Sequence, residues 1–225
     1  GEHLVNKLGE ENITRGDRTG YVPPNVNIVF SVAAYGNMVE HNNDPFLIYQ
    51  ANLLRVAKSL EEIKGTKTKF IYVSTSSVTL PVQTFYSASK KAAEEMIQIA
   101  VRDWGIKAVI VRPGTVIGHG EQNKHLIPVL INSCLTGKEM PFVEKPVHDF
   151  VDVEDIVDGL ILISQKAKFE GEVYEIGTGK QLTNHFIRQI VERLTGRKAN
   201  VQVVDSLRKY DSKRWKANNR SLLAL

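Results

Sequence analysis

A single cysteine, Cys134, is present among the 225 residues, so the chain cannot form an internal disulfide. Such sparse cysteine use is typical of proteins in a reducing compartment, and we expect a cytoplasmic protein. Apolar runs long enough to span a membrane are lacking, so we expect no membrane partner. With 42% hydrophobic residues, the chain instead has enough apolar material for one large domain, or for a domain with a small lobe.

A strong charge of one sign is also lacking, because the formal net charge is +4. Part of the excess comes from basic residues near the C-terminus, namely Arg208, Lys209, Lys213, Arg214, Lys216 and Arg220. We interpret them as a solvated surface and expect no nucleic-acid partner, whereas a phosphate-rich small ligand would suit a mildly basic protein. The histidines show no spacing typical of metal ligands, so we expect no metal.

Apolar runs at 27–34, 69–73 and 108–112 alternate with helical patterns over 45–63 and 86–104. This alternation predicts βαβ units, and therefore an α/β fold built on a parallel sheet. After Gly118 the pattern predicts helices at 126–137, 153–166 and 183–195 and a short strand at 173–176. We expect residues 1–117 to form the sheet domain. Residues 118–225 should form mainly a smaller lobe, interleaved with the sheet, that covers its ligand edge.

Tyr86 and Lys90 stand four residues apart, which places both side chains on one face of the predicted helix. A cation this close favours the phenolate, so Lys90 should lower the pKa of Tyr86 and make it an acid/base group near neutral pH. Upstream, the strand at 69–73 ends in the hydroxyl cluster Ser74-Thr75-Ser76-Ser77. Hydroxyls at the C-terminal end of a strand lie where open α/β sheets bind ligands.

The order of strand, hydroxyl cluster, Tyr/Lys helix, strand and Pro113-Gly114 turn resembles the extended short-chain dehydrogenase/reductase family, specifically its nucleotide-sugar epimerases and dehydratases. Four further segments carry the resemblance: the 27–34 strand with its Ala33-Ala34 ending, the helix led by Asn52, His148–Ile156 and Tyr174–Gly179. The resemblance implies a Rossmann-like, doubly wound parallel sheet with a small C-terminal substrate-binding lobe. It also implies NAD as the coenzyme, with NADP as the alternative.

The resemblance also implies roles for single residues. Tyr86 would be the acid/base, Lys90 would hold the nicotinamide ribose, and Thr75 would bond the reacting hydroxyl. The residues implied in coenzyme binding are Gly1, Asp17, Ala33, Ala34, Asn52, Val73, Tyr86, Lys90, Pro113, Gly114 and Thr115. Those implied in substrate binding are Thr75, Ser76, Ser77, Tyr35, Thr115 and His148. Because His148 stands where relatives carry an arginine, this contact with substrate phosphates should be weaker.

The implied reaction is a transient oxidation of a nucleotide-linked sugar. Family dehydratases carry Asp-Glu directly after the strand-end threonine, whereas Ser76-Ser77 here favours epimerase or reductase chemistry. Two alternatives stay open: a reductase or dehydrogenase of a non-sugar alcohol, and a non-catalytic nucleotide-binding descendant of the fold. Retention of Thr75, Tyr86 and Lys90 together argues against the second.

Parts of the family pattern are short in this sequence. Gly1–Leu8 resembles only the last glycine and the helix of the GxxGxxG turn, and Asn12-Ile13-Thr14 would then be the second strand, with Asp17 near the adenosine ribose. The usual third strand has no room before residue 27. A compact homologue and a sequence that lacks segments would both explain this. By analogy with the family, we expect a homodimer through the helices at 45–63 and 86–104.

Overall fold

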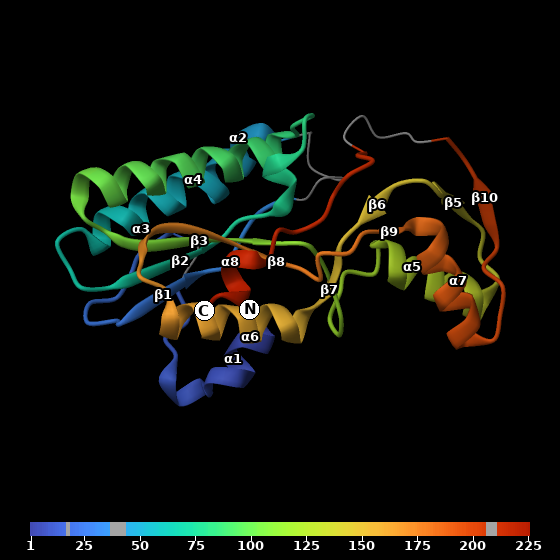
Figure 1. The fold of residues 1–225 in the computed structure, drawn as a ribbon, viewed down its shortest axis with the longest axis horizontal. Coiled ribbons are helices and arrows are strands. Elements are labelled where there is room, and N and C mark those ends of the chain that lie inside the picture. Colours follow the sequence, from blue (N-terminus) through green and yellow to red (C-terminus); the bar gives the residue numbers. More distant parts are fainter. Residues whose placement is uncertain (17–18, 37–43, 206–210) are drawn as a thin grey trace.

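The computed structural model describes residues 1–16, 19–36, 44–205 and 211–225. Its centre is a sheet of four parallel strands in the order β1-β2-β3-β8 (Figure 1). The strands are β1 (Ile28–Ser31), β2 (Lys69–Val73), β3 (Lys107–Pro113) and β8 (Glu170–Ile176). Strands β2 and β3 read as unbroken apolar runs because helices cover both of their faces.

Side chains of β2 alternate between two hydrophobic cores, one on each face of the sheet. Phe70 and Tyr72 point to a core shared with α3 (Arg55–Ile63) and α4 (Phe85–Trp104). Ile71 points to the core shared with α1 (Glu2–Leu8) and α6 (Val153–Lys166). Figure 1 shows these two helical layers on opposite sides of the sheet. The prediction of a Rossmann-like, doubly wound α/β fold is therefore confirmed.

A smaller lobe lies beyond one end of the sheet (Figure 1). Helices α5 (Leu126–Thr136) and α7 (Asn184–Thr195) pack there around a separate core that includes the buried Cys134. Strands β5 (Met140–Phe142) and β10 (Val201–Val203) pair in parallel, and β6 (Val147–His148) and β9 (Leu182–Thr183) pair antiparallel. Strands β4 (Thr115–Ile117) and β7 (Phe150–Asp152) also pair in parallel. A short helix, α8 (Arg220–Leu223), stands near the C-terminus.

Elements from both halves of the sequence build the central domain. Strand β8 is the neighbour of β3, and α6 supplies part of the core under the sheet. The chain therefore leaves the central sheet after β3, returns to this domain at α6 and β8, and enters the lobe again at β9. The boundary at residues 117 and 118 stays a prediction.

Two segments differ from the sequence prediction. Asn12-Ile13-Thr14 is not a strand: Glu10–Asn12 form a 3-10 turn, and the Asn12 amide donates back to the Leu8 carbonyl, which draws the chain into a turn. The helix at 45–63 is interrupted, because a π-helical turn at Gln50–Leu54 separates α2 (Pro45–Tyr49) from α3. Within the described ranges, no helix is both long and apolar enough to cross a bilayer.

Candidate active site

A cluster of hydroxyl side chains, Ser74 to Ser77, follows the C-terminal end of β2. Thr75 caps the 3-10 turn Ser76–Thr79, since its Oγ1 accepts from the Ser77 amide at 3.2 Å and lies 3.0 Å from Ser77 Oγ. Both Ser76 and Ser77 are buried. The Ser74 Oγ is also buried and has no hydrogen-bond partner in the part of the chain that the structure describes.

Helix α4 begins beside this cluster. Thr84 and Ser87 form a reciprocal capping box, which fixes where the helix starts. Tyr86 then lies in the first turn, and Lys90 and Glu94 follow at intervals of four residues, so the three side chains share one helix face. The predicted placement of Tyr86 and Lys90 on one face follows directly from this geometry.

Lys90 is almost fully buried, with 1% of the side chain exposed. Its Nζ donates to the Val73 carbonyl at 2.6 Å and lies 4.3 Å from the centre of the Tyr72 ring. Burial disfavours the charged ammonium and lowers the pKa of Lys90 to about 7, although the carboxylate of Glu94 opposes this change. A lysine with these properties titrates in the range where enzymes work.

The prediction that Lys90 lowers the pKa of Tyr86 is wrong for this structure. Burial raises the pKa of Tyr86 to about 12. Burial of the phenol disfavours its charged form, and the Lys90 ammonium contacts Val73 and the Tyr72 ring. The two phenols are close enough to interact, because a charge on Tyr86 raises the pKa of Tyr72. Tyr86 is therefore a neutral hydrogen-bond donor at neutral pH.

Asn52 connects the chain after β1 to the turn that carries Tyr86. Its side-chain amide accepts from the Tyr35 backbone N–H at 2.8 Å, donates to the Tyr35 carbonyl at 2.9 Å, and donates to Ser89 Oγ at 3.0 Å. Ser89 Oγ in turn donates to the Tyr86 carbonyl at 2.7 Å. Ala33 and Ala34, which precede Tyr35, are exposed at the end of β1. Small side chains there leave this edge of the sheet open.

The turn after β3 is built by close backbone contacts. Gly114 N–H donates to the Ile176 carbonyl and Thr115 N–H donates to the Asp149 carbonyl, both at 2.8 Å. A Cβ at Gly114 would stand 2.6 Å from the Asp149 carbonyl oxygen, so only glycine fits there. This packing holds the Pro113-Gly114-Thr115 turn at the end of the sheet that also carries Thr75.

The buried Asp149 carboxylate joins that turn to the C-terminal segment. It accepts four hydrogen bonds, from the Thr178 amide and hydroxyl and from the amides of Gly179 and Ala217. The Gly177-Thr178-Gly179 turn and residue 217 are therefore fixed to the same carboxylate. The family resemblance includes both Asp149 and the glycine turn, but it does not show that they touch.

His148 lies in a cluster that the sequence prediction missed in part. Its Nδ1 is 3.3 Å from Thr115 Oγ1, and its ring centre is 4.8 Å from that of Trp215. The indole N–H of Trp215 donates to Ser76 Oγ at 2.9 Å. His148, Thr115 and Ser76 are thus brought together, and Trp215 joins them. No spacing or motif points to Trp215, which stands within the basic C-terminal run.

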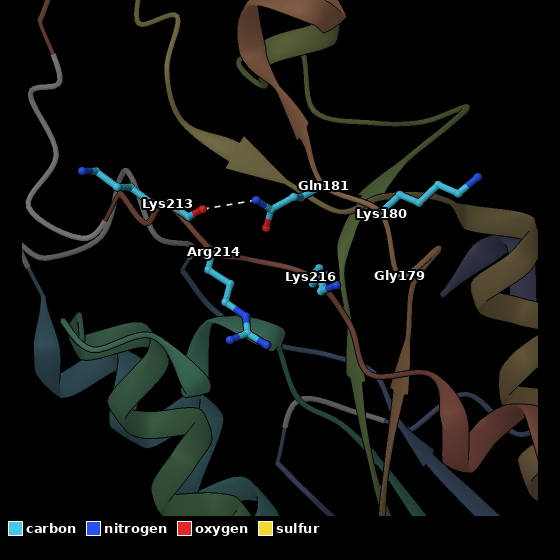
Figure 2. A pocket seen from close by; sticks show the side chains of 6 residues that line it. All are labelled: Gly179, Lys180, Gln181, Lys213, Arg214 and Lys216. Carbon is cyan, nitrogen blue, oxygen red and sulfur yellow. Dashed lines mark hydrogen bonds between the residues drawn. The ribbon is translucent and has the colours of Figure 1, made fainter.

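A basic cavity of about 480 Å³ lies between the turn at 179–181 and the C-terminal segment (Figure 2). Gln181 crosses it, because its amide donates to the Lys213 carbonyl at 3.2 Å. Its cationic lining residues are Lys180, Lys213, Arg214 and Lys216. In Figure 2 the Lys180 and Lys213 side chains point away from each other, so these cations do not converge on one point.

The remaining predicted site residues are Gly1, Asp17 and Tyr35. Gly1 is exposed at the start of α1, whose core lies on the face of the sheet opposite α4. Asp17 lies outside the described residues, so its predicted contact with a ribose stays a prediction. Tyr35 is 38% exposed.

The doubly wound sheet, with the helix that carries Tyr86 and Lys90 beginning at its C-terminal edge, defines a Rossmann-like α/β protein. The family model for the NAD dependent epimerase/dehydratase family matches residues 10–177. The chain belongs to this family.

Individual relatives agree with this assignment. The chain is 29% identical over 195 residues to dTDP-glucose 4,6-dehydratase of Haemophilus influenzae, which covers 76% of this chain and 56% of that protein. It is 23% identical over 222 residues to the uncharacterized UDP-glucose epimerase YtcB of Bacillus subtilis, covering 92% of this chain and 70% of that protein. The chain spans about half the length of the dTDP-glucose dehydratases that it matches.

Two solved structures show the same fold. MoeE5 in complex with UDP-glucuronic acid and NAD has a TM-score of 0.88 at 21% identity, covering 100% of this chain and 88% of that chain. The UDP-glucose 4-epimerase of Thermus thermophilus, in complex with NAD, has a TM-score of 0.83 at 21% identity, with the same coverage.

Proposed function

We propose that the chain is an NAD(P)-dependent epimerase or reductase of a nucleotide-linked sugar, with Tyr86 as the acid/base. One arrangement carries this proposal: α4 sets Tyr86 and the buried Lys90 ammonium one turn apart, and Lys90 is bonded to the end of the strand that leads into Thr75. The family membership supports the reaction class, and relatives named for dTDP-glucose and UDP-glucose support the substrate class.

The described residues fit a dinucleotide at this edge of the sheet. An ammonium has three N–H donors, and the contact with Val73 uses one, so Lys90 can offer others to ribose hydroxyls. Ser74 Oγ is a buried polar atom that lacks a partner among the described residues. The small, exposed side chains of Ala33 and Ala34 leave room for close approach to the backbone at the end of β1, and Gly114 lets the turn after β3 pack against Asp149. These residues would hold the coenzyme, and Asn52 would support them by fixing the backbone at Tyr35, directly after Ala34.

When bound, NAD or NADP supplies the hydride acceptor and donor. Tyr86 is protonated at neutral pH, so it can donate its proton to the oxygen of a keto sugar as that oxygen gains charge. In the opposite direction the Tyr86 phenolate, formed when that proton has left, would take the proton from a sugar hydroxyl while the hydride of the carbon passes to the coenzyme, and Lys90 is the cation available to stabilise the phenolate. Thr75 Oγ1 would orient the reacting hydroxyl by a hydrogen bond.

The surroundings of Thr75 favour epimerase or reductase chemistry over dehydration. Water elimination needs acid/base groups beside the sugar. The hydroxyl of Ser76 accepts from Trp215, and that of Ser77 lies against Thr75 with no exposed surface. Serine hydroxyls in these environments do not exchange protons near neutral pH, unlike the carboxyls expected in a dehydratase.

Substitution of Tyr86 by phenylalanine tests the proposal. Turnover of UDP- and dTDP-linked sugars, followed by NMR of the products, should be lost, while NAD affinity stays within a few-fold of that of the parent protein. Tyr21→Phe, at an exposed tyrosine, is the matched control and should retain turnover. Turnover by Tyr86→Phe would remove this residue from the mechanism, and turnover of only non-sugar alcohols would redirect the substrate class.

Coenzyme binding has its own readout. NAD that binds only the folded state raises the melting temperature by mass action. No change with NAD or NADP at millimolar concentration would overturn the proposed coenzyme site.

We also propose a homodimer through the helices at 45–63 and 86–104. Apolar side chains remain exposed on this layer, namely Phe46, Leu47, Leu54, Phe85 and Ile99. Leu54→Glu should convert a dimer to a monomer in light scattering coupled to size exclusion, while Leu194→Glu, at an exposed leucine on α7, should not. A monomeric parent protein would contradict the proposal.

A further inference from the structure

Glu94 is a buried carboxylate that the proposed reaction does not use. It is 5% exposed and lies one helical turn beyond Lys90 on α4. Arg112, on β3, forms two hydrogen bonds with it: Nε donates to Oε1 at 3.0 Å and Nη2 donates to Oε2 at 2.5 Å. Such a bidentate contact fixes both the position and the charge of the carboxylate.

An ammonium as deeply buried as that of Lys90 needs local support to stay charged. The Val73 carbonyl and the face of the Tyr72 ring each supply part of it, but neither carries a full negative charge. Glu94 does, and a spacing of four residues places it next to Lys90 on the helix surface. Its field acts in the direction that favours the ammonium.

We propose that Glu94, held in place by Arg112, is a positioning residue that keeps the buried Lys90 ammonium charged at the C-terminal end of β2. The functional part of this inference rests on the proposed role of Lys90 in coenzyme binding. The electrostatic part concerns the free protein and does not depend on that role.

The groups around Lys90 come from four elements. Strand β2 presents Tyr72, and α4 presents Tyr86 and Glu94. Burial raises the pKa of both tyrosines, so they are neutral where Lys90 titrates. Arg112 of β3 stands behind Glu94, and Glu175 of β8 lies 3.9 Å from the guanidinium of Arg112. Among these described groups, Glu94 is the anion that acts on Lys90.

The test is a titration of the Lys90 amine by NMR in the free protein, with lysine labelled at 15N and the signal assigned from its loss in Lys90→Met. The parent amine should titrate near pH 7. Glu94→Gln retains the shape of the side chain but not its charge, and Lys90 should then titrate about one pH unit lower. Glu95→Gln, at the exposed neighbouring carboxylate, makes the same charge change and should leave the titration in place.

Equal titrations in the parent protein and Glu94→Gln would overturn the inference, as would an equal change in Glu95→Gln. If Glu94→Gln does not fold, the double variant Glu94→Gln/Arg112→Met removes the carboxylate together with the guanidinium that pairs with it and retains an apolar stem at position 112. It should lower the titration in the same direction but by less, because loss of the Arg112 cation acts in the opposite direction. An unchanged titration in that variant would count equally against the inference.

Turnover gives a separate reading. An enzyme that needs charged Lys90 loses activity above the pKa of that amine, so the alkaline limb of the kcat profile should move to lower pH in Glu94→Gln. If Lys90 titrates at lower pH in Glu94→Gln but the parent protein turns over no nucleotide sugar, the proposed function is refuted and the electrostatic role of Glu94 still holds. Turnover of a nucleotide sugar with an unchanged Lys90 titration in Glu94→Gln would support the proposed function and refute the electrostatic role of Glu94.

Discussion

Replacing Lys90 by methionine should stabilise the fold while removing a residue of the proposed site. The pKa of Lys90 falls from 10.5 to about 7, and each pH unit of this difference corresponds to about 1.4 kcal/mol of unfolding free energy. The burial cost of the ammonium is therefore about 5 kcal/mol at pH 6. Methionine has a similar length but forfeits the bond to Val73 and the contact with the Tyr72 ring, worth about 1 kcal/mol each. We expect a net gain of about 3 kcal/mol at pH 6.

The pH dependence identifies the cause. Between about pH 7 and 10.5 the unfolded lysine is protonated while the folded one is neutral, so the stability of the parent protein rises with pH in this window. Below pH 7 both states hold the proton and the cost is constant. The advantage of Lys90→Met should therefore be largest at pH 6 and should shrink by about 1.4 kcal/mol per pH unit above pH 7.

Urea unfolding followed by circular dichroism at several pH values between 6 and 9.5 measures this difference. Lys91→Met, at the exposed neighbouring lysine, should change stability little at any of these pH values. An advantage of Lys90→Met that is the same at pH 6 and pH 9 would show that Lys90 does not bury a charge, and the reasoning would fail.

Three further substitutions probe the frame of the site. Gly114→Ala should destabilise by about 2 kcal/mol in urea unfolding, because its Cβ meets the Asp149 carbonyl, whereas Gly16→Ala, with no atom nearby, should not. Asp149→Ala leaves four donors without their acceptor and should lower stability by about 3–5 kcal/mol. Asp149→Asn should also lower it substantially, because its NH2 group can only donate and would face two of these donors; a stability equal to that of the parent protein would contradict a role for the second carboxylate oxygen. Trp215→Phe should abolish any fluorescence change on adding a nucleotide sugar, because the indole lies between His148 and Ser76, and a retained change would place the ligand elsewhere.

Much of the fold could be predicted from local sequence. The β2 and β3 runs are continuously apolar because both faces of those strands are buried, and this pattern has few alternatives in a short segment. The start of α7 could also be predicted, since Thr183 caps the helix by accepting from the Phe186 amide at 3.1 Å. The prediction for Asn12–Thr14 was wrong because three residues show no periodicity, and a side-chain bond to Leu8 decides their path.

The chemistry of the site was less predictable than its location. Spacing alone found Tyr86 and Lys90, because four residues make one helical turn. Their pKa values depend on burial and on Tyr72 and Glu94, which only the packed structure brings around the amine. Trp215 lies 139 residues from its partner Ser76, and no local pattern encodes such a contact.

The π-helical turn at Gln50–Leu54 has a mechanical consequence. It carries Asn52, whose side-chain amide forms hydrogen bonds with the Tyr35 backbone and with Ser89 Oγ. Ser89 Oγ in turn donates to the Tyr86 carbonyl. The backbone at Tyr35 and the first turn of α4 are therefore tied to each other by side chains alone, with no strand of the sheet taking part in the connection.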